Sequence, residues 1–244
     1  GGIGLFLLGM SLLTDGLKDF AGPWLRTQLL RFTGTPYKAF ASGFLATLFI
    51  QSSSATTVAV IGFVSAGLLT FPQALGAVFG ASLGTTATGW IVALVGLKFK
   101  LGLYVLPLLV VGVFLRLLGR GRQVFLGNSL AGFALIFVGL EFMQLAMQGL
   151  TQQLDLTSLE GGGVAASILA VVLGVVLTVL VQSSSATVAT TLTAVSSGTI
   201  SFDLAAGVVI GAAIGTTITG VLAALRASVS ARRTAIAHVV FNLV

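Results

Sequence analysis

The chain is a series of long apolar segments separated by short polar ones. No charged residue occurs between Lys38 and Lys98, and none occurs between Glu160 and Asp203. Each of these stretches has room for more than one membrane-spanning helix of ~20 residues. The pattern predicts a first span over about 2–20 and an equivalent span over about 123–149, and it predicts later spans over about 101–118 and from about 230 onward.

Two apolar segments are interrupted by the same polar sequence, QSSSAT, at Gln51–Thr56 and again at Gln182–Thr187. The apolar pieces on either side are about 13–16 residues long, and at ~1.5 Å per residue such a helix is too short to cross a ~30 Å hydrocarbon core. We therefore predict re-entrant helical hairpins over about 38–69 and about 164–198, each with its polar residues at the tip. The following stretches, about 73–97 and about 204–225, carry a GTT sequence at which we expect the helix to be interrupted.

The two motifs belong to an internal duplication. The alignment that places Gln51 on Gln182 also places Gly80–Gly89 on Gly211–Gly220, where seven of the ten positions are identical. We interpret residues 1–120 and 121–244 as homologous halves of a single transport domain. If the hairpins do not cross, each half has three spans, one of them broken, and an odd number gives the halves opposite orientations. The predicted fold class is an all-α polytopic membrane protein with two inverted-topology repeats, each carrying one QSSS hairpin.

Composition and charge agree with this topology. Hydrophobic residues make up 56% of the 244 residues and charged residues only 7%, whereas about a quarter of the residues of a soluble domain are charged. Ten of the twelve basic residues fall on one predicted side, which the positive-inside rule makes cytoplasmic: Lys18, Arg26, Arg31, Lys38, Arg116, Arg120, Arg122, Arg226, Arg232 and Arg233. The other side receives Lys98, Lys100, Asp155, Glu160 and Asp203. We expect a multi-pass protein of the cell (inner or plasma) membrane, surrounded by the lipid bilayer.

Several classes of function are disfavoured. The basic residues are scattered at segment ends, which does not indicate nucleic-acid binding. The sequence has no cysteine, which excludes disulfides and Cys-ligated metals. It contains no recognisable nucleophile–base pair or metal cluster, so we predict that the protein is not an enzyme. The chain starts without Met and stops within apolar sequence, so we expect both ends to be truncated.

The predicted hairpin tips have the chemistry of an ion-binding site. In each hairpin the second helix begins just after the serines, so its free N–H groups and the positive end of its dipole face the tip, and such ends bind anions. Serine hydroxyls donate to the oxygens of an anion and also offer lone pairs to a cation. The motifs contain no cationic side chain, so dipoles and co-bound cations must offset the charge of a bound anion. Inverted repeats with broken helices are typical of secondary transporters, whose site lies near the midplane.

The GTT motifs add further oxygen ligands. Thr85 and Thr88 are three residues apart, as are Thr216 and Thr219, and this spacing places each pair on one helix face. Hydroxyls and freed carbonyls are hard donors suited to Na⁺. A structural interpretation stays open beside this one, because serine-rich turns and small-residue motifs also serve helix packing in membranes.

Two other polar positions lie in predicted spans. Glu141 is interpreted either as a coupling-ion ligand or pH sensor, or as a side chain that snorkels to the interface. Its counterpart in the first half is Ser11, so Glu141 breaks the symmetry. His238 and Asn242 are four residues apart and are interpreted as a helix-packing polar pair.

Paired QSSS motifs in inverted halves, each followed by a G-x-x-x-G-T-T segment, resemble the type II sodium–phosphate cotransporter family and its bacterial branch. The resemblance covers nearly the whole chain and implies Na⁺-coupled uptake of inorganic phosphate by alternating access, with Na⁺ as the co-transported ion and no organic cofactor. By similarity, the phosphate site comprises Gln51, Ser52, Ser53, Ser54, Thr56, Ser183 and Ser184. The implied Na⁺ site comprises Gln182, Ser183, Ser185, Thr216 and Thr219, with Thr85 and Thr88 added from the first GTT motif.

The resemblance and its rivals lead to further expectations. Some bacterial members continue into a cytoplasmic helical regulatory domain, which fits the truncated C-terminus, and a homodimer is left open. The nearest rival is a Na⁺-coupled carboxylate or amino-acid carrier, but such carriers commonly place an Arg or Asp near the substrate, and here the predicted core has only Glu141. A channel or a non-transporting membrane scaffold is the rival from another class. A channel requires a continuous wet pore, whereas two opposed hairpins favour an alternating gate.

Overall fold

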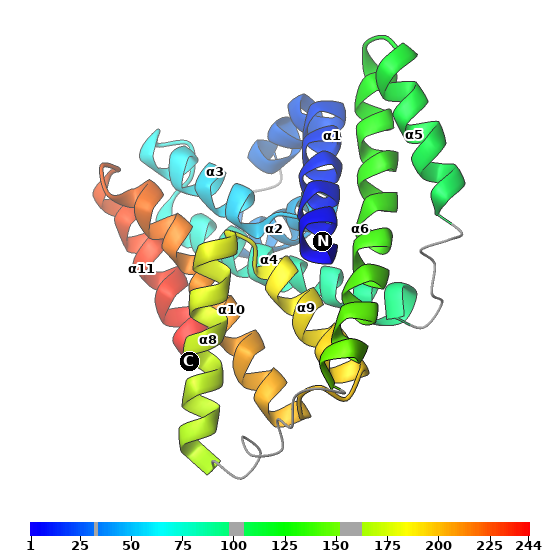
Figure 1. The fold of residues 1–244 in the computed structure, drawn as a ribbon. Coiled ribbons are helices and arrows are strands. Elements are labelled where there is room, and N and C mark those ends of the chain that lie inside the picture. Colours follow the sequence, from blue (N-terminus) through cyan, green and yellow to red (C-terminus); the bar gives the residue numbers. More distant parts are fainter. Residues whose placement is uncertain (32–33, 98–104, 152–162) are drawn as a thin grey trace. The chain divides into compact units, whose positions relative to one another are not determined.

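The computed structural model describes residues 1–31, 34–97, 105–151 and 163–244, which form helices joined by short turns (Figure 1). In chain order the helices are α1 (Gly2–Arg31), α2 (Pro36–Ile50), α3 (Ser53–Ser65), α4 (Phe71–Trp90), η1 (Ile91–Leu97), α5 (Leu106–Leu118), α6 (Arg122–Thr151), α8 (Gly163–Val181), α9 (Ser184–Ser196), α10 (Phe202–Ala224) and α11 (Val229–Leu243). Four stretches are long and apolar enough to cross a membrane: Phe71–Leu94, Arg122–Ala146, Gly163–Val181 and Phe202–Ala224. The chain is therefore an all-α, multi-pass membrane protein.

Both QSSS motifs lie between two helices, as predicted. α2 and α3 flank the first motif, α8 and α9 flank the second, and the helices of each pair contact each other. α8 is 19 residues long, which exceeds the expected length and makes α8 itself a candidate span. Re-entry of the hairpins from one side of the membrane stays a prediction. Of the residues used to argue topology, Lys98, Lys100, Asp155 and Glu160 lie outside the described residues.

The predicted interruption at each GTT motif is wrong. α4 is continuous from Phe71 to Trp90, and α10 is continuous from Phe202 to Ala224. Within these helices Thr85 Oγ1 donates to Ala81 O (3.2 Å) and Thr219 Oγ1 donates to Thr216 O (2.9 Å), so the hydroxyls are satisfied without any unwinding. In the first half the irregular backbone comes later, in the π-helix η1.

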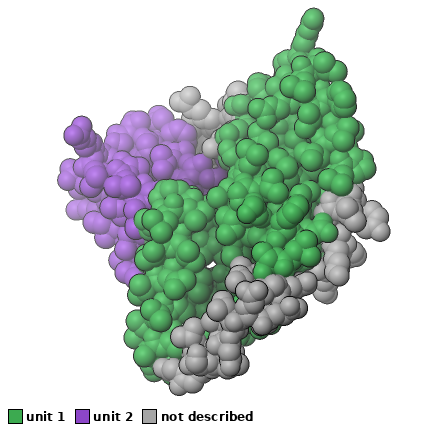
Figure 2. Space-filling view, in the orientation of Figure 1, with its two compact units in different colours: residues 1–20, 88–215 green, residues 21–87, 216–244 purple. Residues whose placement is uncertain are grey.

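The chain divides into two compact units, shown in Figure 2. Unit 1 comprises residues 1–20 and 88–215, and unit 2 comprises residues 21–87 and 216–244. The boundaries fall inside α1, α4 and α10, each of which contributes to both units. This division follows packing rather than the duplication, so the sequence halves 1–120 and 121–244 stay a prediction.

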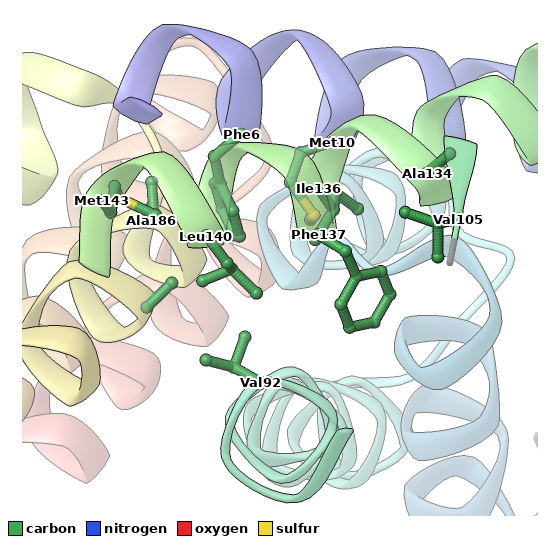
Figure 3. Packing of buried hydrophobic residues seen from close by; sticks show 11 residues of the cluster. Phe6, Met10, Val92, Val105, Ala134, Ile136, Phe137, Leu140, Met143 and Ala186 are labelled. Atoms are coloured by element: carbon green, nitrogen blue, oxygen red, sulfur yellow. The ribbon is translucent and has the colours of Figure 1, made fainter. Parts of the chain in front are cut away.

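The core of unit 1 is formed by α1, η1, α6 and α9. Phe6 and Met10 of α1 lie beside Phe137 and Leu140 of α6, and Val92 of η1 belongs to the same cluster (Figure 3). Since lipid tails are as apolar as these side chains, the cluster is stabilised by van der Waals contact rather than by removal from water. Close packing of the backbones is therefore the main requirement.

Glycines supply that close packing between α1 and α6. A methyl group on Gly9 would lie 2.7 Å from Ile136 N and 2.8 Å from Gly132 O, and one on Gly2 would lie 2.9 Å from Gly139 O. Because the earlier glycine of α1 faces the later part of α6, the two helices run antiparallel.

A second glycine-mediated crossing occurs in both halves of the sequence. In unit 2, α2 crosses α4 where Gly43 faces Ala77 and Gly80 faces Phe40. In unit 1, α8 crosses α10 where Gly174 faces Val208 and Gly211 faces Val171, and the alignment of Gln51 with Gln182 makes these four positions the counterparts of the first four. The duplicated sequence thus forms the same helix contact twice.

Unit 2 is completed by α3 packing on α11, where Ser228 N–H donates to Ser65 Oγ (3.1 Å).

Candidate functional site

The glutamine of each QSSS motif ends the first helix of its hairpin. Gln51 and Gln182 have φ values of 57° and 55°, and within the described residues they are the two non-glycine residues with positive φ. Each side chain turns back on its own helix: Gln51 Nε2 donates to Leu48 O and Gln182 Nε2 donates to Val179 O, both at 2.6 Å. These amides therefore satisfy carbonyls that a helix C-terminus leaves open.

The first serine of each motif starts the second helix. Ser52 has extended backbone (φ −146°), and its Oγ accepts from Ala55 N at 3.2 Å. Ser183 is the equivalent N-cap of α9 and accepts from Ala186 N at the same distance. Serine is a preferred residue at this position because its hydroxyl satisfies an orphan N–H group of the first turn. Gln51, Ser52 and their counterparts thus build the turn.

A threonine pair bridges the two helices of each hairpin. Thr47 Oγ1 donates to Thr56 Oγ1 (3.0 Å) in the first hairpin, and Thr178 Oγ1 donates to Thr187 Oγ1 (2.9 Å) in the second. All four side chains are buried. Thr56 was predicted as part of the phosphate site, and the structure shows that its hydroxyl is engaged inside the hairpin. The sequence reasoning missed Thr47 and Thr178, although the alignment that pairs the QSSS motifs pairs these two threonines as well.

The glycine of each GTT motif lies against this bridge. A methyl group on Gly84 would lie 2.8 Å from both Phe44 O and Thr47 Cβ, and one on Gly215 would lie 2.9 Å from Thr178 Cβ. The GTT helix of each half therefore supports the hairpin of the same half, close to the QSSS turn. This contact gives a structural reason for the two motifs being duplicated in one register.

The second and third serines of each motif remain available to a ligand. The backbone N–H groups and hydroxyls of Ser53, Ser54, Ser184 and Ser185 have no hydrogen-bond partner within the described residues, whereas the next N–H groups along each helix do. Ser53 and Ser185 are each only 8% exposed. Each tip thus offers two N–H groups and two hydroxyls at a helix N-terminus, which is an arrangement that binds oxyanions. Of the predicted phosphate ligands, Ser53, Ser54 and Ser184 therefore have both an N–H group and a hydroxyl without a partner, and Ser185, which was predicted as a Na⁺ ligand, has the same free groups.

The predicted Na⁺ residues carry oxygen atoms that can bind a cation, with Gln182 and Ser183 in the turn of the second hairpin and Ser185 and the four threonines on helices. Thr85 and Thr219 give their hydroxyl protons to carbonyls of their own helices, which leaves oxygen lone pairs for a cation. Thr88 is buried and Thr216 is half-buried. Gln182, Ser183 and Ser185 belong to unit 1, whereas Thr216 and Thr219 belong to unit 2, so their grouping stays a prediction. No cluster of three His, Cys, Asp or Glu side chains occurs within the searched, described part of the chain.

The remaining polar positions differ from expectation in part. Glu141 is half-buried on α6, and its role stays a prediction. Asn242 Nδ2 donates to the backbone carbonyl of His238 (2.8 Å) rather than to the ring. The ring Nε2 lies 3.4 Å from Ser82 Oγ, whereas Nδ1 and the hydroxyl of Thr57 are buried without a hydrogen-bond partner.

Comparison with known proteins gives consistent results. The family model described as Na⁺/Pi-cotransporter matches residues 5–145 and 154–244. The chain is 39% identical over 132 residues (54% of this chain, 41% of the relative) to "Uncharacterized protein YqeW" of Bacillus subtilis (strain 168). It is 34% identical over 152 residues (62% and 27%) to "Putative inorganic phosphate export protein YjbB" of Escherichia coli (strain K12). It is 33% identical over 93 residues (37% and 14%) to "Sodium-dependent phosphate transport protein 2A" of Ovis aries.

The matches cover only part of these relatives. The aligned region spans less than half the length of each of the three. No solved structure matches the chain.

Proposed function

Since the chain belongs to the Na⁺/Pi-cotransporter family, we propose that it is the membrane domain of a secondary active transporter that couples the movement of inorganic phosphate to the movement of Na⁺. The observation that carries the proposal is the pair of hairpin tips, each with two unpartnered N–H groups and two serine hydroxyls. Phosphate offers four oxygens as acceptors, which match such a set of donors. Ser53, Ser54, Ser184 and Ser185 are the proposed phosphate-contacting residues.

We assign the other predicted ligands a supporting role. Gln51, Ser52 and Thr56 hold the first turn through their local hydrogen bonds, and Gln182 and Ser183 do the same in the second. Replacing any of them is expected to change the shape of a tip rather than to delete a contact with phosphate.

Na⁺ supplies the positive charge in this proposal. Neither QSSS motif contains a cationic side chain, and two helix dipole ends each carry only about half an elementary charge. The hydroxyl oxygens of Thr85, Thr88, Thr216 and Thr219 are the proposed Na⁺ ligands, in agreement with the preference of Na⁺ for hard oxygen donors. Binding of Na⁺ is expected to raise phosphate affinity, and by linkage phosphate raises Na⁺ affinity by the same factor.

The two halves are proposed to be inverted-topology repeats that provide alternating access. Support comes from the antiparallel pair α1 and α6, the predicted first spans of the two halves. Gly2 faces Gly139 and Gly9 faces Gly132. The alignment of the two first spans places Gly2 on Gly132 and Gly9 on Gly139. Replacing each glycine by its counterpart therefore turns the contact of Gly2 with Gly139 into the contact of Gly132 with Gly9, and the reverse. Such an exchange is the relation expected between repeats with a pseudo-two-fold axis in the membrane plane.

The experiment is ³²P-phosphate uptake into proteoliposomes that contain the full natural protein. Uptake is expected with an inward Na⁺ gradient and not with an equal K⁺ gradient. Loss of loaded phosphate under an outward Na⁺ gradient is measured in parallel, because one relative is named for phosphate export. Equal rates of phosphate transport with the Na⁺ gradient and with the K⁺ gradient would contradict the coupling.

The rival carboxylate or amino-acid symporter is tested in the same vesicles. Na⁺-driven movement of succinate or glutamate without movement of phosphate would contradict the assignment of phosphate as substrate.

A further inference from the structure

Unit 2 contains an apolar groove with a volume of about 670 Å³ between α4 and α11. Phe71, Leu75 and Phe79 line it from α4, and Ile236, Val240 and Phe241 line it from α11. Phe79 and Phe241 stack with ring centroids 4.3 Å apart. Ile236 and Val240 are more than half exposed, so the groove is open along α11. In a multi-pass membrane protein, such a surface accommodates hydrocarbon chains.

Arg233 is the one charged residue that lines this groove. It is exposed, lies near the start of α11, and forms no ion pair or hydrogen bond within the described residues. The adjacent Arg232 differs, because its Nε donates to Ala227 O (3.2 Å). An arginine that is unpaired beside apolar surface favours an anionic partner.

Unit 2 has no acidic residue that could be this partner. Residues 21–87 and 216–244 contain no Asp or Glu, and their basic residues are Arg26, Arg31, Lys38, Arg226, Arg232 and Arg233. This unit therefore carries the whole net charge of +6 of the chain. A second copy of the same surface would add positive charge beside Arg233. The counter-charge for Arg233 must come from outside unit 2.

We propose that the groove is a binding site for an anionic phospholipid, with an acyl chain between α4 and α11 and the headgroup phosphate on the guanidinium of Arg233. An anionic phospholipid combines an apolar tail with a phosphate at one end, and the groove combines an apolar lining with one cation at one point. The proposal does not depend on the transported substrate. Since a basic residue near an anionic membrane surface contributes ~1 kcal/mol, phosphatidylglycerol should be preferred to phosphatidylcholine about fivefold.

The test is native mass spectrometry of the delipidated full protein, titrated separately with phosphatidylglycerol and phosphatidylcholine. The wild type should bind phosphatidylglycerol about fivefold more tightly. Arg233→Gln should abolish this preference, whereas the matched control Arg232→Gln should retain it. Ala237→Phe, which adds a ring to the lining of the groove, should weaken the binding of both lipids. Melting temperatures report whether each variant is folded.

Three outcomes would overturn the proposal. The first is an equal lipid preference of Arg233→Gln and Arg232→Gln. The second is complete displacement of phosphatidylglycerol by inorganic phosphate, which would make the Arg233 site one for free phosphate. The third is a change in oligomeric mass on Arg233→Gln without a change in lipid binding, which would make the groove a protein interface.

Discussion

Replacing Gly84 with alanine tests whether the glycine of the GTT motif holds the QSSS hairpin in place. The new methyl group would lie 2.8 Å from Phe44 O and 2.8 Å from Thr47 Cβ, which is closer than side-chain carbons approach other atoms in proteins. The first contact is backbone and the second belongs to the threonine bridge, so neither can move without shifting α2. Overpacking of this kind costs ~1–3 kcal/mol.

Gly62→Ala in α3 is the matched control, because a methyl group there meets nothing within 4 Å. Both substitutions gain ~1 kcal/mol from the higher helix propensity of alanine, so this gain cancels in the comparison. The remaining difference of ~1–3 kcal/mol corresponds to a gap of roughly 2–12 °C in melting temperature for a chain of this size. Gly84→Ala is expected to be the less stable protein.

The assay is thermal unfolding of both variants in the same detergent, followed by fluorescence and by loss of helical circular dichroism. Gly215→Ala should behave like Gly84→Ala, since its methyl group would lie 2.9 Å from Thr178 Cβ. Equal melting temperatures for Gly84→Ala and Gly62→Ala would refute the close-packing argument.

Three other predictions concern the first hairpin and its neighbours. Thr47→Val removes the hydrogen bond to Thr56 and should lower the free energy of unfolding by ~0.5–1.5 kcal/mol. In a double-mutant cycle, a direct interaction is confirmed if Thr47→Val/Thr56→Val loses less stability than the two single variants lose together. Thr57→Val should leave the melting temperature unchanged or raise it, because the buried hydroxyl has no hydrogen-bond partner and a valine occupies the equivalent position 188 in the second half. A clear drop in melting temperature would show that the hydroxyl is hydrogen-bonded. At Gln51, where φ is 57°, Gln51→Gly should retain more stability than Gln51→Val, and the reverse order would contradict the left-handed conformation.

The helical arrangement around the motifs could be predicted from the sequence because its signals are local. The hairpin helices follow from apolar segments on either side of Gln51 and Gln182, and the N-cap role of the serines follows from residue type. The register of the repeat also predicted that the two GTT motifs lie at equivalent positions in the two halves, on the helix that follows each hairpin. These features require no knowledge of which helices touch.

The errors arose where a residue serves tertiary contact. The helix was expected to be interrupted at each GTT motif, but Gly84 and Gly215 instead allow a neighbouring helix to approach, and composition does not distinguish these uses. The ligand roles of Gln51, Gln182 and Thr56 stay predictions, and what the sequence did not indicate is that their side chains form hydrogen bonds within the hairpin. Short-range periodicity also missed Thr47 and Thr178, because a single threonine in an apolar helix carries no signal of its partner.

The central claim is that phosphate binds at the serines of the hairpin tips. Its most direct test is the phosphate affinity of the full protein, measured in Na⁺ buffer and in K⁺ buffer for the wild type and for serine variants. Hydrogen bonds to a charged ligand contribute ~1.5–3 kcal/mol, so Ser53→Ala and Ser184→Ala should each weaken binding roughly 10- to 150-fold in Na⁺. Ser167→Ala is the control, since that hydroxyl donates to Gly163 O in its own helix, near the end of α8 opposite to the QSSS turn. Loss of affinity in the two tip variants, but not in the control, is the predicted result. Wild-type affinity in Ser53→Ala and Ser184→Ala would contradict a phosphate site at the hairpin tips.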